Sequence, residues 1–519
     1  MHEVKPRLFM EIPYYLKIGK ASDLEIPKER KIYRFLEILP GLASWTTLIL
    51  VVLFSWLIPV WTSIFVICFV VYWLVRSFYF SFHLNSCYKR MRENEKIDWM
   101  KKVKEVDGWK NIYHLVVIAT YKEPLEIIRE SFLSLADSDW PNNKIIVVLS
   151  YEEKGGEDSE KTAEAIKEEF GENFFKILIV KHPFGLKGEI SGKGANESWG
   201  MKKAKQEIID PLKIPFQNII ASSFDADTRV FSKYFSILAY RYLTIKDSLR
   251  CSFQPIPLFI NNIWQSPPIS RIFSFSASFW QMMCQERPEK LITFSSHSMS
   301  FKTLVDVGFR QTNVVSDDSR IFWQSFLKYK GDYRVVPLYY PISMDANCAP
   351  KFIETMKNVY KQQRRWAYGA GEIAYSFFGF MKVKGIPLTK KISLGGILFE
   401  AHWSWATSSI VIFMLGWLPL ILGGERFGQT LLAYNLPVFV SRILTIAMLG
   451  LVGSAYLSIF ILPPKPPEYG KKKYIFFVLE WFLLPFVMIF FTSLPALDAQ
   501  TRLMLGKYMG FWSTPKIRK

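Results

Sequence analysis

Cysteine and histidine are scarce in this chain of 519 residues, which contains five of the first and six of the second. The cysteines form no CxxC pair and are odd in number, so the sequence favours a reducing compartment over a disulfide framework. Zinc-ligand spacing and HExxH are absent, and no GxxxxGK[ST] loop is present, which disfavours a P-loop ATPase. A metal ion held by carboxylates stays open.

Acidic residues are also few relative to basic ones. The chain has 46 Asp and Glu against 65 Lys and Arg, a formal net charge of +19. Half of the residues are hydrophobic and 16% are aromatic, which excludes a disordered or low-complexity protein. So large a positive charge indicates a polyanionic neighbour, which is nucleic acid, a phosphorylated substrate or the acidic face of a membrane.

Formal charge is missing altogether between Ile38 and Val75. A single helix of that length would reach about 57 Å, whereas the hydrocarbon core of a bilayer is about 30 Å thick. Because Pro59 stands near the centre, we predict a membrane hairpin with spans at about 41–58 and 62–84. Three more apolar segments follow, at about 393–423, 431–462 and 474–495. The region between the two groups has the composition of a soluble domain.

The distribution of Lys and Arg predicts the orientation of these segments. Basic residues precede the first span, at Lys5, Arg7, Lys17, Lys20, Lys28, Arg30, Lys31 and Arg34. The positive-inside rule places this end and the soluble region in the cytoplasm of a multi-pass protein of the inner or plasma membrane. Basic loops and headgroup-facing helices explain the charge more simply than nucleic acid does. The tail after Leu497 is basic too, so either one late segment is re-entrant or double, or the tail violates the rule.

The soluble region alternates strand-like and helix-like segments. Short apolar runs with β-branched residues occur at 114–119, 144–150, 174–181 and 218–224. Polar stretches at about 123–137, 157–170 and 195–209 fit helices between them. This alternation predicts an α/β fold with a doubly wound, mostly parallel sheet, in which ligands bind at the carboxyl ends of the strands.

Three polar clusters carry the candidate chemistry. Asp225 and Asp227 follow the fourth strand, where paired carboxylates suit Mg²⁺ or Mn²⁺ with substrate phosphates, although a solvated acidic turn would look the same. Ser316-Asp317-Asp318 opens a helix predicted at about 319–329, where acidic residues also simply favour the helix dipole. Residues 362–366, QQRRW, lie in a basic aromatic stretch that equally fits an amphipathic helix at the membrane surface.

Taken together in this order and spacing, the clusters resemble the motifs of a known family. The chain is similar to the membrane-integrated, cellulose-synthase-like members of the family-2 inverting glycosyltransferases, which are marked by D, DxD, [TE][ED]D and QxxRW. The resemblance covers about 112–370, and segments 119–124 (ATYKEP) and 192–196 (GKGAN) match further family segments. The chain departs from the pattern at Thr120, Lys122 and Asp317, and at 150–153 (SYEE), a segment that commonly contacts the nucleobase in this family.

The resemblance implies a fold, an activity and a set of site residues. The fold would be GT-A-like with transmembrane helices on both sides, and the activity would be transfer of a sugar, with inversion, from a nucleotide-diphosphate sugar, expected to be a UDP-sugar. Asp318 would be the catalytic base, and Asp225 and Asp227 would bind Mg²⁺ or Mn²⁺. The donor would contact Thr120, Glu123, Lys193, Asp225, Asp227 and Arg365, and the acceptor Gln362, Trp366 and His297. Met299 lies in the same SSHSMS stretch as His297.

Four regions follow from these expectations. They are a cytoplasmic segment with the hairpin at 1–110, the transferase domain at 111–345, interfacial helices with QxxRW at 346–392, and a membrane bundle with a basic tail at 393–519. The expected acceptor is a growing β-linked polysaccharide or a membrane lipid, and the other partners are membrane lipids, with no protein partner evident. The competing interpretation is a non-catalytic membrane protein, either a nucleotide-sugar-binding regulator or a transporter.

Overall fold

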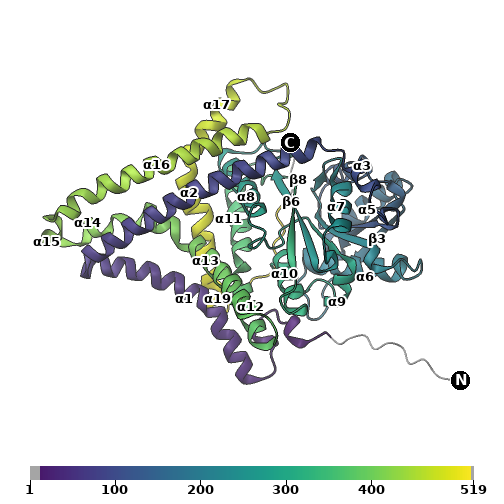
Figure 1. Ribbon diagram of the computed structural model, residues 1–519, viewed down its shortest axis with the longest axis horizontal. Helices are drawn as coiled ribbons and strands as arrows, with labels where there is room; N and C mark the ends of the chain where they lie inside the picture. The colour runs from purple at the N-terminus through teal and green to yellow at the C-terminus, as the bar shows by residue number, and fades with distance from the viewer. Residues whose placement is uncertain (1–11, 516–519) are drawn as a thin grey trace.

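The computed structural model describes residues 12–515, except the side chains at 449 and 451. Lys5 and Arg7 of the predicted basic segment, and Lys516, Arg518 and Lys519 of the predicted basic tail, lie outside the described residues. Two parts are visible in Figure 1, a layered region of strands and helices and a set of long helices that extends away from it. The central helices α8, Pro268–Gln285, and α11, Phe352–Ala367, lie between the two parts.

Eight strands form one sheet in the order β3-β2-β1-β4-β7-β6-β8-β5. Four of them match the predicted strands, namely β1 Tyr113–Thr120, β2 Ile145–Glu152, β3 Lys176–His182 and β4 Ile219–Asp225. These four pair in parallel. The remaining strands are β5 Arg229–Val230, β6 Cys251–Phe259, β7 His297–Ser300 and β8 Arg334–Met344. They extend the sheet with both antiparallel and parallel pairs, so the sheet as a whole is mixed.

Helices cover both faces of the sheet, because successive side chains of a strand point to opposite faces. In β1, Val116 and Ile118 belong to one hydrophobic cluster, and Leu115 and Val117 belong to the other. The first cluster includes helices α4 Leu125–Ala136, α5 Glu157–Phe170 and α7 Tyr234–Thr244. The second includes α6 Lys193–Ala204, α9 Phe301–Val307 and α10 Asp317–Lys328. The predicted α/β fold with flanking helices is therefore confirmed.

The predicted N-terminal hairpin consists of two long helices, α1 Pro27–Leu57 and α2 Pro59–Lys96. They are separated at Ile58, immediately before Pro59. Both helices are long and apolar enough to cross a membrane. Each extends well beyond the predicted span, and α2 continues through a polar segment that ends at Lys96, beside the α/β part.

The late apolar segments form two further helical stretches with the same property, α16 Leu431–Ile461 and the stretch Lys472–Met504. The second is built from α17 Lys472–Leu479, α18 Leu484–Met488 and α19 Leu494–Met504, joined by short irregular helical turns. The predicted segment 393–423 corresponds to α13, Leu388–Phe413, and the short α14, Leu418–Leu422, with a bend of 48° between them. Such a bend fits either a broken span or a re-entrant loop.

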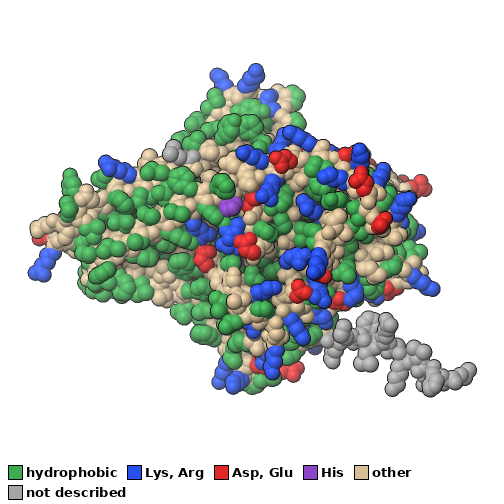
Figure 2. All heavy atoms as spheres, in the orientation of Figure 1, with side chains coloured by type: hydrophobic (Ala, Val, Ile, Leu, Met, Phe, Trp, Pro, Cys, Tyr) green, Lys and Arg blue, Asp and Glu red, His purple; other side chains and the backbone are tan. Residues whose placement is uncertain are grey.

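Apolar side chains cover the surface of the long helices, whereas charged side chains gather on the α/β part and at the ends of the helices (Figure 2). Trp56 and Trp61, on either side of the hairpin turn, are 65% and 68% exposed. So large an apolar surface is costly in water and is typical of a membrane-embedded region. Between the two parts, Arg271 of α8 forms a buried ion pair with Glu480.

Candidate active site

A cavity of about 440 Å³ opens at the carboxyl ends of β1, β2 and β4. This is the edge at which parallel α/β sheets bind ligands, and the volume falls in the range of about 300–1,000 Å³ usual for ligand pockets. One wall is the start of α10, and another is the end of α11. The chain returns after α19, so residues 511–514 complete the wall.

Eight of the ten predicted site residues line this cavity. They are Thr120, Glu123, Lys193, Asp225, Asp318, Gln362, Arg365 and Trp366. They come from the end of β1, the start of α6, the end of β4, the start of α10 and the end of α11, which lie far apart along the chain. The sheet and the packing of α11 against the apolar helices bring these segments together.

The other two predicted residues, Asp227 and His297, are not among those that line the cavity, and both are buried. Asp227 Oδ2 accepts a hydrogen bond of 2.8 Å from the backbone N–H of Asp345, which does line the cavity. His297 lies on β7, with its Nδ1 2.8 Å from the carbonyl oxygen of Phe294. Burial lowers the pKa of His297 to about 3, so its imidazole is neutral. The structure thus places both residues behind the cavity wall.

Lys193 is at the centre of the charged groups. It is the first residue of α6, and its Nζ lies 2.5 Å from Asp225 Oδ1 and 3.2 Å from Asp318 Oδ2. Burial alone would lower the pKa of this ammonium, but the two carboxylates outweigh burial and raise the pKa of Lys193 well above its ordinary value. Lys193 therefore stays charged and joins the end of β4 to the start of α10.

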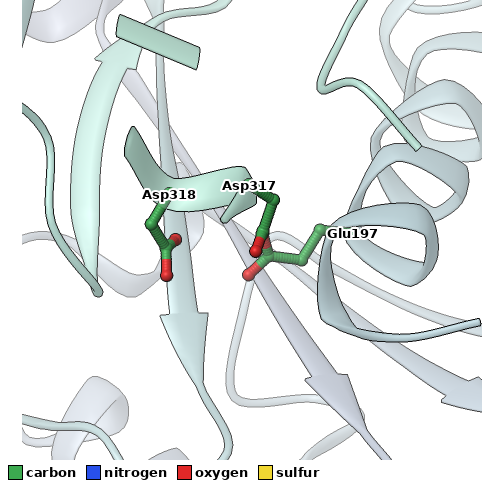
Figure 3. A group of neighbouring side chains, drawn as sticks. All are labelled: Glu197, Asp317 and Asp318. Carbon is green, nitrogen blue, oxygen red and sulfur yellow. The ribbon is translucent and has the colours of Figure 1, made fainter. Parts of the chain in front are cut away.

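Asp318 belongs to a group of three acidic side chains beside Lys193, the others being Glu197 and Asp317, as Figure 3 shows. Their ligand oxygens lie within 4.8 Å of one another. Arg310 compensates part of this charge, because its guanidinium forms ion pairs with Glu197, with Asp317 at 3.5 Å and with Asp318 at 2.9 Å. Arg310 itself is buried, so these pairs form with little water around them.

The acidic groups differ in protonation because their surroundings differ. Burial alone would raise the pKa of Asp318. The positive charges of Lys193 and Arg310 outweigh burial and hold the pKa of Asp318 below its ordinary value. Burial and the neighbouring Asp318 raise the pKa of Asp317 to about 6. Burial likewise raises the pKa of Glu197 to about 7, in spite of Arg310. At neutral pH, Asp318 is thus the carboxylate most firmly held in its ionised form.

Arg365, near the end of α11, is a further cation that lines the cavity. Its guanidinium carbon lies 4.6 Å from the ring centroid of Phe511, and its Nε makes no hydrogen bond within residues 12–515. Burial lowers the pKa of Arg365 from its ordinary value, although nearby aspartates oppose the shift. A half-buried guanidinium with an unused donor is suited to bind an anion that enters the cavity.

Trp366 and Gln362 line the cavity from α11, which packs against α19. The Trp366 ring packs against the rings of Phe273 and Phe294, at centroid distances of 5.5 and 5.6 Å. Gln362 Oε1 accepts a hydrogen bond of 3.3 Å from Asn347 Nδ2. An aromatic ring beside an amide is the kind of surface that binds a sugar ring through its apolar face and hydroxyls.

Several residues of the site were not predicted from the sequence. Ser295 Oγ donates a hydrogen bond of 2.5 Å to Asp225 Oδ2, and Arg310 pairs with the acidic groups. Glu152, at the end of β2, lines the cavity and lies 3.2 Å from His182. Phe511 lies so close to Gly192 that a Cβ there would collide with its ring. Gly192 is the first residue of the GKGAN segment, which the sequence had singled out, but nothing in the sequence connected residue Phe511 to it.

The donor atoms of the site suit a hard divalent cation. Carboxylate oxygens are the ligands that Mg²⁺ and Mn²⁺ prefer. Asp225, Asp317, Asp318 and Glu197 pair with Lys193 and Arg310, so several carboxylate oxygens gather in one place. Of the two predicted metal ligands, Asp225 lines the cavity, whereas Asp227 lies behind it.

No protein-family model matches the chain, and no curated protein matches it. Several solved structures are similar in fold. The mannosyltransferase PcManGT from Pyrobaculum calidifontis, in complex with GDP-Man and Mn²⁺, is 13% identical, with a TM-score of 0.44 over 76% of this chain and 99% of that one. Residues 1–349 of S. aureus TarS, in complex with UDP-GlcNAc, are 12% identical, with a TM-score of 0.37 over 67% of this chain and 92% of that one.

GalNAc-T7 with UDP, GalNAc and Mn²⁺ is also similar, at 12% identity and a TM-score of 0.33, over 56% of this chain and 58% of that one. All three have TM-scores below 0.5.

Proposed function

We propose that this chain is a membrane-embedded, inverting glycosyltransferase that moves a sugar from a nucleotide-diphosphate sugar to a β-linked polysaccharide or a membrane lipid. The observation that carries the proposal is that eight of the ten residues selected from separate sequence motifs line one cavity. If the acidic motifs were only solvated turns and the QxxRW segment only a surface helix, their side chains would not be expected to line the same cavity. The proposal extends the resemblance to the family-2, cellulose-synthase-like enzymes, and a UDP-sugar is the expected donor.

The cations of the cavity suit a diphosphate. Lys193 and Arg365 lie on different walls, so a diphosphate between them would be approached from two sides. When the bond between the sugar and the diphosphate breaks, negative charge develops on the departing phosphate oxygen. Fixed cations in a partly dehydrated cavity stabilise such charge more than water does. Thr120 and Glu123, at the end of β1, are proposed to contact the nucleotide.

Asp318 is proposed to accept the proton of the acceptor. The acceptor hydroxyl oxygen forms a bond to the anomeric carbon, the bond from that carbon to the phosphate oxygen breaks, and the hydroxyl proton passes to the carboxylate. A single displacement of this kind inverts the anomeric centre. The depressed pKa of Asp318, due to Lys193 and Arg310, keeps the carboxylate ionised before the reaction.

A divalent cation bound at Asp225, with Asp227 as the second proposed ligand, would supply electrostatic stabilisation of the departing diphosphate. Ser295 holds one Asp225 oxygen, and Lys193 holds the other. Asp227 holds the backbone of Asp345 at the cavity wall. These contacts orient the end of β4 toward the space in which the diphosphate would lie.

The acceptor is proposed to reach the cavity from the membrane side. Trp366 and Gln362 are on α11, which packs against α19 of the apolar stretch. His297 would act from behind the wall through Phe294. The α/β part would then lie in the cytoplasm, with the regions 1–110 and 393–519 providing the membrane helices and 346–392 connecting them to the site.

The decisive experiment is an assay of nucleotide release. Full-length protein in detergent or lipid nanodiscs is incubated with a panel of UDP- and GDP-sugars and Mn²⁺ or Mg²⁺, and the nucleoside diphosphate formed is measured. We expect release from at least one donor, and loss of release in Asp318→Asn. Binding of nucleotide-sugars without any turnover would instead support a regulator, and turnover unchanged in Asp318→Asn would contradict the assigned base.

A further inference from the structure

Glu37 is a buried carboxylate of α1 that the proposed reaction does not use. Its side chain is 1% exposed, and it accepts hydrogen bonds from three donors, two of which lie on segments outside α1. Ala21 N–H donates to Oε1 at 3.0 Å, and Tyr508 O–H donates to Oε2 at 2.8 Å. The Arg34 guanidinium, one turn away in α1, pairs with Oε2 at 2.8 Å. Burying a carboxylate is unfavourable unless its oxygens are paired in this way.

The first of these segments is a strap, defined here as residues 13–24, which precedes α1. Ala21 belongs to it, and its Leu16 and Ile18 are buried. The strap contacts the loop that leads to Asp318, the proposed base. Asn313 Nδ2 donates to the carbonyl oxygen of Lys17 at 3.1 Å, and a Cβ at Gly19 would lie 2.5 Å from the Asn313 carbonyl oxygen.

A second contact ties the strap to α10 itself. Arg320 donates from its guanidinium to the carbonyl oxygen of Ile18 at 2.9 Å and from Nε to Glu372 at 2.6 Å. Glu372 in turn accepts a hydrogen bond of 2.7 Å from Ser316, the residue that caps α10 just before Asp317 and Asp318. The strap therefore fixes both the loop and the helix that carry the proposed base.

The second segment is the tail, defined here as residues 505–514. The Tyr508 hydroxyl donates a hydrogen bond to Glu37. The backbone N–H of Met509 donates one of 3.3 Å to the hydroxyl oxygen of Tyr368. Phe511, three residues after Tyr508, packs against Gly192 and Arg365 at the cavity. The tail thus contacts α1 through Tyr508 and forms part of the wall of the proposed donor site through Phe511.

Arg34 strengthens the connection from the other side. Besides pairing with Glu37, its guanidinium donates to the carbonyl oxygens of Leu503 and Met504 at 2.9 and 2.5 Å. These are the last carbonyls of α19, which lack partners within the helix. Glu37 and Arg34 together hold the point at which α19 ends and the tail begins.

We propose that Glu37 is a positioning residue through which membrane helix α1 holds both the strap and the tail, and thereby two parts of the cavity wall. The hydrogen bond from Ala21 to Glu37, here called the strap arm, holds the strap that fixes Asp318. The hydrogen bond from Tyr508 to Glu37, the tail arm, holds Phe511 against Arg365. One carboxylate with two oxygens serves three donors. An amide in its place offers a single acceptor oxygen, so it cannot serve all three.

The test is hydrogen–deuterium exchange of the full-length protein in nanodiscs, followed by mass spectrometry. In Tyr508→Phe, which removes only the hydroxyl, we expect exchange in 505–514 to rise about tenfold or more, as expected when a hydrogen bond to a charged group is lost. Exchange in 13–24 should stay unchanged. The matched control is Tyr113→Phe, which removes a hydroxyl that accepts a 3.0 Å hydrogen bond from Lys144, at the amino end of β1.

Ala21→Pro tests the strap arm, because proline lacks the N–H that binds Glu37. Ala21 opens a short helical turn after Lys20, whose extended backbone (φ −153°, ψ 164°) suits the position before proline. We expect faster exchange in 13–24 and 309–316 but not in 505–514. Glu37→Gln should accelerate exchange in both segments. If Glu37→Gln fails to fold, the two single-arm variants still decide the question.

Wild-type exchange in the tail of Tyr508→Phe, or in the strap of Ala21→Pro, would overturn the proposal. The kinetic consequence rests on the proposed function. Tyr508→Phe should raise the KM for the donor more than it lowers kcat, whereas Ala21→Pro should lower kcat more than it changes KM. If the wild-type protein shows no transfer, the proposed function fails while the exchange data still decide the role of Glu37.

Discussion

The ammonium of Lys193 lies 2.5 Å from the carboxylate of Asp225. One residue begins the helix after the third strand, and the other ends the fourth strand, so this contact closes the crevice between them. The ion pair also neutralises a carboxylate that would otherwise be repelled by Asp318. A diphosphate in the cavity would give Lys193 another anionic partner besides Asp225 and Asp318, and would leave Asp225 oxygens for a cation.

Removing divalent cations should therefore abolish sugar transfer. With EDTA present, we expect nucleoside diphosphate release to fall to the background rate and to return on addition of Mn²⁺ or Mg²⁺. Asp225→Asn should lose the metal-dependent part of nucleotide affinity, because the charge that holds the cation is gone. Calorimetric titration of the nucleotide with and without metal measures this. Full turnover in EDTA would contradict the assigned role of Asp225.

Replacing the proposed base should slow the chemical step and spare donor binding. In Asp318→Asn, we expect transfer to fall by about 10²-fold or more, the usual contribution of general base catalysis. Nucleotide affinity should stay near the wild-type value. The control is Asp332→Asn, an exposed aspartate paired with Arg250, which should keep full activity. A similar loss in both variants would point to a general effect on folding.

Truncating the aromatic ring of the tail should weaken donor binding. Phe511→Ala removes the ring that stacks on Arg365, and a cation–π contact of this kind corresponds to a rise in donor KM of about three- to tenfold. The matched control is Phe216→Ala, whose ring lies 5.3 Å from the Lys205 ammonium at the amino end of β4, outside the cavity. Steady-state kinetics at saturating acceptor gives the comparison. An unchanged KM would show that Phe511 does not position Arg365.

Stability should fall as the pH rises through neutrality. The pKa of Glu197 is raised by burial from 4.5 to about 7, so the folded protein binds this proton more tightly than the unfolded chain does. Its contribution is fully present below about pH 4.5 and is lost as the pH passes about 7. Thermal unfolding between pH 5 and 8 should show a decline that is smaller in Glu197→Gln. Glu169→Gln, an exposed glutamate paired with Arg129, should decline like the wild type.

The first half of the sheet was predictable because β1 to β4 are runs of β-branched and aliphatic residues with turn signals between them. The second half was not, for reasons visible in its residues. β6 contains Pro255 and Pro257, and β8 contains Pro337 and Pro341, residues that argue against a buried strand. β7 is only the polar stretch His297–Ser300, which the sheet buries between β4 and β6.

The position of a site residue was predictable where a short motif lies at the end of a strand or the start of a helix. Asp225 ends a strand and Asp318 begins a helix, so both positions follow from local structure. Asp227 is different, because the turn after β4 directs it inward to the backbone of Asp345, and only the folded chain shows this. Arg310 and Phe511 depend on contacts between distant segments, which no local pattern encodes.

The cavity has a wall at Thr120 and another at Thr514, and every apolar helical stretch that follows the sheet lies between them in the sequence. During synthesis, the α/β part emerges long before Phe511 does. The nascent chain therefore carries an open, unfinished site until the last apolar stretch has left the ribosome and α19 has docked beside α1. On the proposed function, sugar transfer would therefore begin only after the membrane part is in place.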